Sequence, residues 1–222
     1  MWIEDPLEIR LLDSRGWSSL PLVGSERVKS NSRTLNEIAA YQLGGSLGIP
    51  LPCARYFFTK RPLQIDGIPR HIGAPVLLIE DISPTRSCPN IIDAPCCSNE
   101  KAKCLAFFTL CGGCEWPEVH ITESGVYLLD LEFQFALFPT VEIDVNAVLC
   151  DYKKQSESAI RYSLETAQNG GLEDAYWEYM NGMVASCGNF SPDFGQTSSM
   201  KKVSRFIKNS IELRLEVISR LL

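Results

Sequence analysis

The hydrophobic pattern of the chain changes near residue 83, and this change limits the folds that it can adopt. Before that point, short apolar runs alternate with polar turns, which is the pattern of β-strands. After it, apolar residues mostly recur at helical spacing. We therefore expect an α+β protein whose sheet comes first. The strands are expected at residues 7–12, 20–24, 27–29, 54–59 and 74–80, with a hairpin turn at Asp66-Gly67.

One helix is expected within the strand-rich part. Thr34-Leu-Asn-Glu37 is a capping-box pattern, and apolar residues follow it at helical spacing until Gly48 and Pro50. This spacing predicts a helix over residues 35–47. Glu37 can complete the capping box or belong to a functional site, and the sequence leaves both interpretations open.

The second part is expected to contain four helices and one β-hairpin. Three prolines make residues 83–98 an irregular connection, and Ser98 is a suitable cap for the helix that follows. The hairpin is expected at residues 119–131, around the turn Glu123-Ser-Gly125. The helices are expected at residues 99–111, 151–167, 172–186 and 200–221.

Charge and hydropathy exclude some classes of protein. The 222 residues carry a net charge of −6, which argues against a duplex-DNA-binding protein, because such proteins bind phosphates with Lys and Arg. The chain has no apolar run of the roughly 18 residues that a membrane-spanning helix needs. Its first residues lack the basic start and apolar stretch of a secretory signal, so a cytoplasmic protein is expected.

The nine cysteines are expected to be free thiols in a reducing cytosol. Six of them lie between Cys88 and Cys114, and Cys111-Gly-Gly-Cys114 has the spacing of zinc sites and redox pairs. A structural zinc site usually has a second pair with similar spacing, whereas Cys96 and Cys97 are adjacent. A zinc site or a redox pair therefore stays an alternative to ordinary buried or exposed thiols.

The residues with the clearest chemistry flank the predicted hairpin. Glu115, His120 and Asp130 are separated by five and ten residues. A phosphoryl-transfer site places a carboxylate base and two metal ligands on a loop and on the hairpin that follows it, so this spacing is that of such a site. Asp130 also follows a run of apolar residues, where a carboxylate is costly to bury unless it is paired or metal-bound.

Three segments carry a resemblance to a known family. Residues 34–52 have an Asn-Glu helix that ends in a Leu-Gly-hydrophobic-Pro turn. Residues 110–122 stand where the family has Gly-Asn-x-Asp-Arg-His-x-x-Asn. Residues 126–133 stand where the family has a strand that ends in a metal-binding Asp. The chain resembles HipA-like kinases and, more distantly, phosphatidylinositol kinases. This resemblance implies a two-lobed protein-kinase-like fold. Residues 1–82 would form the strand-rich N-lobe and residues 83–222 the helical C-lobe of one kinase-like domain.

The resemblance also implies roles for individual residues. Glu115 stands in place of the catalytic Asp, His120 in place of the metal-binding Asn, and Asp130 keeps the type of the metal-binding Asp. ATP would be the nucleotide, with Mg²⁺ or Mn²⁺ as the cation. Glu132, two residues beyond Asp130 on an extended strand, is expected to supply a further metal oxygen. Lys29 and Glu37 would hold the nucleotide phosphates, and adenine would meet the backbone near Glu80 and Ile82.

Three functions are therefore compared. The first is an atypical ATP-dependent phosphotransferase with a divergent catalytic loop and a protein or small-molecule acceptor. The second is a pseudokinase that binds a nucleotide or a protein without turnover, which the replaced Asp and Asn suggest. The third is a zinc- or thiol-dependent module built on Cys88, Cys96, Cys97, Cys104, Cys111 and Cys114.

Overall fold

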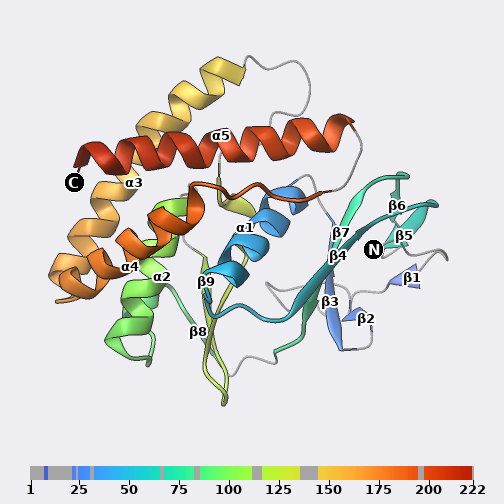
Figure 1. Ribbon diagram of the computed structural model, residues 1–222. Coiled ribbons are helices and arrows are strands. Elements are labelled where there is room, and N and C mark those ends of the chain that lie inside the picture. Colours follow the sequence, from blue (N-terminus) through green and yellow to red (C-terminus); the bar gives the residue numbers. More distant parts are fainter. Residues whose placement is uncertain are drawn as a thin grey trace.

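The structure is a computed structural model, and its architecture is α+β (Figure 1). It describes residues 8–9, 22–23, 25–30, 33–65, 68–82, 86–111, 117–135, 145–194 and 198–221. The strand-rich part comes first in these ranges, and the long helices come last, as the change in hydrophobic pattern predicts. None of the helices in these ranges combines the length and the apolar composition required to cross a bilayer.

The main sheet is antiparallel and has the strand order β2-β3-β7-β4. Its strands are β2 (Leu22–Val23), β3 (Glu26–Lys29), β7 (Pro75–Glu80) and β4 (Ala54–Phe58). The central strand β7 is a continuous apolar run whose residues 76–79 are all buried, because other elements cover both faces of the sheet there. Lys29 lies opposite Leu77 of this strand, so the end of β3 is at the middle of the sheet.

Helix α1 (Thr34–Ser46) connects β3 to β4 and packs against β7. It begins one residue before the predicted start, and Arg33 occupies its N-cap position. The capping-box interpretation is therefore wrong, because Thr34 is the first helical residue and the Glu37 carboxylate has partners outside the helix. Gly44 lets the helix approach its neighbours closely, since a Cβ atom there would lie 2.6 Å from Leu51 Cδ1.

Two smaller sheets complete the strand content of the described residues. One consists of β1 (Glu8–Ile9), β5 (Leu63–Ile65) and β6 (Ile68–Arg70). The antiparallel pairing of β5 with β6 agrees with a turn at Asp66-Gly67, although the turn itself lies outside the described residues. The other sheet consists of β8 (Arg86–Cys88), β9 (Glu118–Ile121) and β10 (Val126–Leu129). The β9–β10 hairpin was predicted, but β8 was not, because it lies in the segment that was predicted to be irregular. Its short polar sequence has no strand pattern of its own, and it forms a strand through pairing with β9.

The helical part is built around α2 (Ser98–Cys111), which packs against α4 (Glu173–Cys187), α3 (Val145–Asn169) and α5 (Ser198–Leu221). In Figure 1 the long helix α5 crosses this part of the molecule. Residues 104–111 of α2 are all buried, so this helix is the core of the helical part and not merely one of its amphipathic walls. The predicted apolar faces of α4 and α5 are confirmed by the burial of Tyr176, Met180, Met183, Val203, Phe206, Ile207 and Ile211.

Candidate functional site

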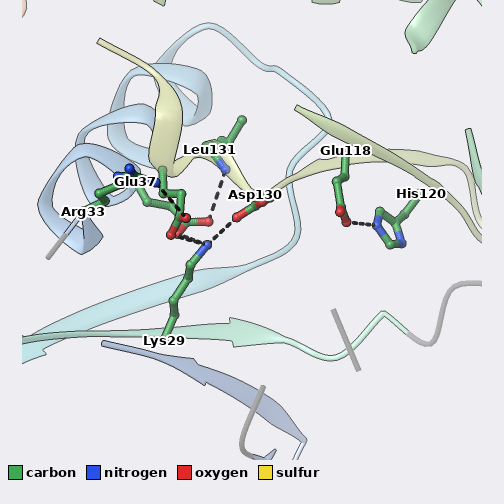
Figure 2. A network of polar contacts seen from close by, with 8 residues as sticks. Lys29, Arg33, Glu37, Glu118, His120, Asp130 and Leu131 are labelled. Carbon is green, nitrogen blue, oxygen red and sulfur yellow. Dashed lines mark hydrogen bonds and ion pairs between the residues drawn. The ribbon is translucent and has the colours of Figure 1, made fainter. Parts of the chain in front are cut away.

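A cluster of charged side chains lies where the main sheet, α1 and the β9–β10 hairpin meet (Figure 2). Its centre is the ammonium group of Lys29, the last residue of β3, whose side chain is only 10% exposed. This ammonium lies 2.9 Å from Glu37 Oε2, 2.5 Å from Asp130 Oδ1 and 3.0 Å from Glu132 Oε2. The connection from Lys29 to α1 is only four residues long, and it suffices to bring Glu37 onto the lysine.

Glu37 projects from the first turn of α1 and is fully buried. While Oε2 pairs with Lys29, Oε1 accepts a hydrogen bond from the backbone N–H of Leu131 at 3.3 Å. Burial raises the pKa of Glu37, and the nearby ammonium of Lys29 acts in the opposite direction. Glu37 therefore joins three segments of the chain, the strand before its helix, the helix itself and the residue after Asp130.

Asp130 follows β10 and has a left-handed backbone conformation, with φ 56° and ψ 53°. Such a conformation is strained for a residue other than glycine, and strained residues of this kind gather at functional sites. The carboxylate of Asp130 is 38% exposed, so solvent reaches it from one side while Lys29 neutralises it from the other. Asp130 is thus paired, as the sequence required, but it is not enclosed.

Glu132 lies in η3 (Leu131–Phe133), a short 3₁₀ helix, and not in an extended strand as predicted. The left-handed backbone at Asp130 turns the chain, and the tight helix then brings the Glu132 carboxylate back to Lys29. Arg33 also approaches Glu132, at 3.7 Å, from the start of α1. The predicted neighbourhood of Asp130 and Glu132 is therefore found, although it arises from a turn and not from strand alternation.

The cluster has more negative than positive charge. Carboxylate oxygens of Glu37, Asp130 and Glu132 all lie within 4.8 Å of one another, and one buried ammonium serves all three. Burial alone would lower the pKa of Lys29, but Glu37 and Asp130 more than offset it, so the pKa is raised and the lysine stays charged at neutral pH. Three convergent carboxylates are the oxygen donors that Mg²⁺ and Mn²⁺ prefer. The donor set therefore fits a divalent cation.

His120 is not part of this donor set. It lies on β9 with its side chain 7% exposed, and its Nε2 is 2.8 Å from Glu118 Oε2. The hydrogen bond with His120 lowers the pKa of Glu118, while partial burial opposes the shift. In the view of Figure 2, Glu118 lies between His120 and Asp130. His120 thus contacts a carboxylate on its own strand and lies outside the three-carboxylate group, and its role as a metal ligand beside Asp130 stays a prediction.

Two residues of this region were not predicted as site residues. Glu118 is exposed, but its position two residues from His120 on one strand is a signal that both side chains share a face. Tyr41 lies one helical turn beyond Glu37, and its buried hydroxyl has no hydrogen-bond partner among the described residues. Burial raises the pKa of Tyr41, and the carboxylates of Glu37 and Asp130 add to the rise.

The remaining predicted site residues lie elsewhere. Glu115 is outside the described residues. Glu80 is the last residue of β7 and lies three residues beyond Leu77, which is opposite Lys29. Along the strand this separation is about 10 Å. Its backbone N–H donates to Cys53 O at 2.8 Å, and its carboxylate accepts from Cys53 N at 3.3 Å. Ile82 is partly buried against the core. Neither residue belongs to the Lys29 cluster, so an adenine role for the backbone at residues 80–82 stays a prediction.

The cysteines that the structure describes do not form a candidate metal centre. The one group of three ligand-type side chains found among the described residues is the carboxylate cluster, which contains no cysteine. Cys104 and Cys111 are buried in α2, and burial raises the pKa of Cys104 to about 12 and that of Cys111 well above its usual value. Such thiols stay protonated and are poor metal ligands. Cys114, the second residue of the predicted pair, lies outside the described residues.

Comparison of the chain with protein-family models, with curated proteins and with solved structures finds no match. The assignment of a function to this chain therefore rests on the geometry of the Lys29 cluster and on the sequence pattern around it.

Proposed function

We propose that this chain is an atypical ATP-dependent phosphotransferase with a two-lobed, HipA-like kinase fold. The observation that carries the proposal is the position of Lys29, which contacts Glu37 of the following helix and Asp130 at the end of the hairpin. In protein kinases a strand lysine pairs with a helix glutamate, and a metal-binding aspartate must be in place beside them. The same three residue types meet here from elements in the same chain order.

The arrangement of elements around the cluster supports the two-lobed division near residue 82. The antiparallel sheet and α1 supply Lys29 and Glu37, whereas the β9–β10 hairpin and η3, which belong to the second part of the chain, supply Asp130 and Glu132. Catalytic groups contributed by both parts would meet a nucleotide between them. The sequence has no Gly-x-Gly-x-x-Gly loop, so the connection between β2 and β3, which includes Ser25, is the segment proposed to cover the nucleotide phosphates.

Each residue of the cluster receives a role. Asp130 and Glu132 would hold a divalent cation, Mg²⁺ or Mn²⁺, and Glu37 would hold Lys29 in position. Lys29, which stays charged at neutral pH, would bind phosphate oxygens of the nucleotide. The cation supplies charge neutralisation at the transferred phosphoryl group. Glu115 stays the proposed base for the acceptor hydroxyl.

A pseudokinase is the second candidate, and the contact between His120 and Glu118 favours it. An active site needs a further metal ligand where His120 stands, and this imidazole is instead 2.8 Å from the Glu118 carboxylate. In that case the Lys29 cluster would retain nucleotide or cation binding, and the function would be recognition of a protein partner without phosphoryl transfer.

Nucleotide binding and phosphoryl transfer are measured separately to decide between the two. A thermal-shift titration with ATP and Mg²⁺ or Mn²⁺ is expected to raise the melting temperature of the wild type, because a ligand that binds only the folded state stabilises it. At a fixed concentration of the cation, Lys29→Met should abolish the additional shift caused by ATP, whereas Lys154→Met, at an exposed position of α3, should retain it. Absence of any shift in the wild type would refute the phosphotransferase and favour a pseudokinase that binds a protein partner.

Radiolabel transfer from ATP to the protein itself or to casein then tests catalysis. Asp130→Asn should abolish transfer, and Glu123→Gln, an exposed carboxylate in the hairpin turn, is the matched control. Nucleotide binding without transfer to the protein itself or to casein would refute a protein kinase that accepts these substrates and would favour the pseudokinase.

A further inference from the structure

A second charged region lies on α5, far along the chain from the Lys29 cluster. Four cations, Lys201, Lys202, Arg205 and Lys208, occur within eight residues of a protein whose net charge is −6. Lys201, Arg205 and Lys208 are spaced by four and three residues, so they share one face of the helix, whereas Lys202 points to another. The three residues follow one another over about 10 Å of helix, and the Cβ atoms of neighbours are about 5–6 Å apart.

The face with the three cations forms one wall of a cleft of about 630 Å³, and residues 191–194 form the opposite wall. This volume is within the range of small-molecule sites, but such sites are mostly apolar, whereas this lining is polar. Ser191 and Asn209 add a hydroxyl and an amide group to the cations. The composition of the cleft therefore suits an anion with several hydrogen-bond acceptors.

Hydrogen bonds from both sides fix the wall at residues 191–194. The Asp193 carbonyl accepts from Gln42 Nε2 at 2.9 Å and from the Tyr56 hydroxyl at 2.6 Å, and the Asp193 N–H donates to Gln42 Oε1 at 3.0 Å. On the other side, the Ser204 hydroxyl donates to Pro192 O at 2.6 Å. The cleft is thus held open between α1, β4 and α5, so a ligand would bind with little ordering of the protein.

The carboxylates of the cleft are unevenly placed. Glu212 lies 3.8 Å from the ammonium of Lys208 and offsets its charge, and Asp193 lies on the opposite wall. Lys201 and Arg205 are exposed and form no ion pair with a described carboxylate. Lys is a compact point charge and Arg is a planar fork that binds phosphate oxygens through two N–H groups, so the pair suits adjacent phosphate groups.

We propose that this cleft binds a compact polyanion with at least two neighbouring phosphate groups. The site is distinct from the Lys29 cluster, and its existence does not depend on the proposed phosphotransferase activity. The ligand is defined by chemistry alone, as an oligophosphate or a small molecule with neighbouring phosphate groups.

Tripolyphosphate is the probe, and isothermal titration with EDTA present is the measurement. Without divalent cations the excess carboxylates of the Lys29 cluster repel a phosphate anion, so the metal-free condition isolates the cleft. The wild type is expected to bind one tripolyphosphate, and Arg205→Gln should weaken binding about tenfold. Lys202→Gln removes the same charge from another face of the same helix and should change binding less than about twofold.

The outcomes separate a specific site from general attraction. Equal weakening in Arg205→Gln and Lys202→Gln, or no saturable binding to the wild type, would overturn the proposal. Binding of a glutamate oligomer as tight as that of tripolyphosphate would also overturn it, because the ligand would then be recognised by charge and not by phosphate geometry. Lys201→Gln is the second cleft variant, and it replaces Arg205→Gln if that variant melts at a lower temperature than the wild type.

Discussion

The surplus of carboxylates around Lys29 predicts an asymmetric response to mutation. Lys29→Met leaves Glu37, Asp130 and Glu132 without their shared ammonium, and Glu37 has no access to solvent. Glu37→Gln, by contrast, leaves Lys29 with two carboxylates, and the amide oxygen of Gln can still accept the Leu131 N–H. The first variant should therefore lose much more stability than the second.

The magnitudes follow from distance and burial. At 2.9 Å and an effective dielectric constant of about 20, two unit charges attract by about 6 kcal/mol, and the desolvation of both groups cancels a large part of this. Removal of one partner from a buried pair typically costs 3–5 kcal/mol, and we expect about this loss of unfolding free energy for Lys29→Met. For Glu37→Gln we expect about 1 kcal/mol or less. Within the Lys29→Met protein, Glu37→Gln should restore about 2 kcal/mol, because it removes a buried carboxylate that has lost its cation.

Urea unfolding of the four proteins, followed by far-UV circular dichroism at neutral pH with EDTA, measures these energies as a double-mutant cycle. Lys154→Met is the control for loss of an exposed lysine and should change the unfolding free energy by less than about 0.5 kcal/mol. Equal losses in the two single variants, together with additivity in the double variant, would refute a shared ammonium at the centre of the cluster.

Three further outcomes are expected. Mn²⁺ or Mg²⁺ without nucleotide should raise the melting temperature, and the rise should be larger in Lys29→Met, where no ammonium competes for the carboxylates, than in the wild type; a smaller rise would contradict cation binding by the cluster. The contribution of Lys29 to stability should be constant below its pKa in the unfolded chain, about 10.4, and should be lost as pH rises through its higher pKa in the folded protein. The difference in unfolding free energy between the wild type and Lys29→Met should therefore shrink only in alkali. Gln42→Leu should cost about 0.5–1.5 kcal/mol in urea unfolding, because it removes the hydrogen bonds of the Gln42 amide to the exposed backbone of Asp193; an unchanged midpoint would show that this contact does not fix the wall of the cleft.

Elements with a strong local pattern could be predicted from the sequence. Helix α1 was expected at residues 35–47 and occupies residues 34–46, and α4 was expected at residues 172–186 and occupies residues 173–187. In both, the spacing of apolar residues is a local signal that tertiary packing reinforces. Helix α3 begins six residues earlier than expected, at Val145, because the apolar run that opens it has no clear helical period.

Contacts between distant segments could not be predicted in the same way. The Glu37–Leu131 hydrogen bond joins residues 94 positions apart, and the Gln42–Asp193 contact spans 151 positions. The family resemblance placed Lys29, Glu37 and Asp130 in one site, but it did not indicate the contact between His120 and Glu118 on the same strand. Whether a histidine binds a metal or is structural depends on which side chains surround it in the fold, and no local sequence pattern distinguishes the two cases.

The left-handed backbone at Asp130 offers a test of the turn that builds the site. Among described residues other than glycine, Asp130 and Phe135 have positive φ, and this conformation costs a Cβ-bearing residue about 1–2 kcal/mol. Asp130→Gly and Asp130→Ala both remove the carboxylate from Lys29, so they differ only in backbone preference. Glycine gains from relief of strain but loses about 0.4–1 kcal/mol through greater freedom of the unfolded chain.

The balance predicts that Asp130→Gly is more stable than Asp130→Ala by about 0.5–1 kcal/mol in urea unfolding. At an ordinary position with negative φ the order is reversed, because alanine is then favoured. An alanine variant more stable than the glycine variant would therefore mean that residue 130 does not turn the chain in the left-handed region. In that case η3 could not bring Glu132 back to Lys29, and the three-carboxylate donor set would lose its structural basis.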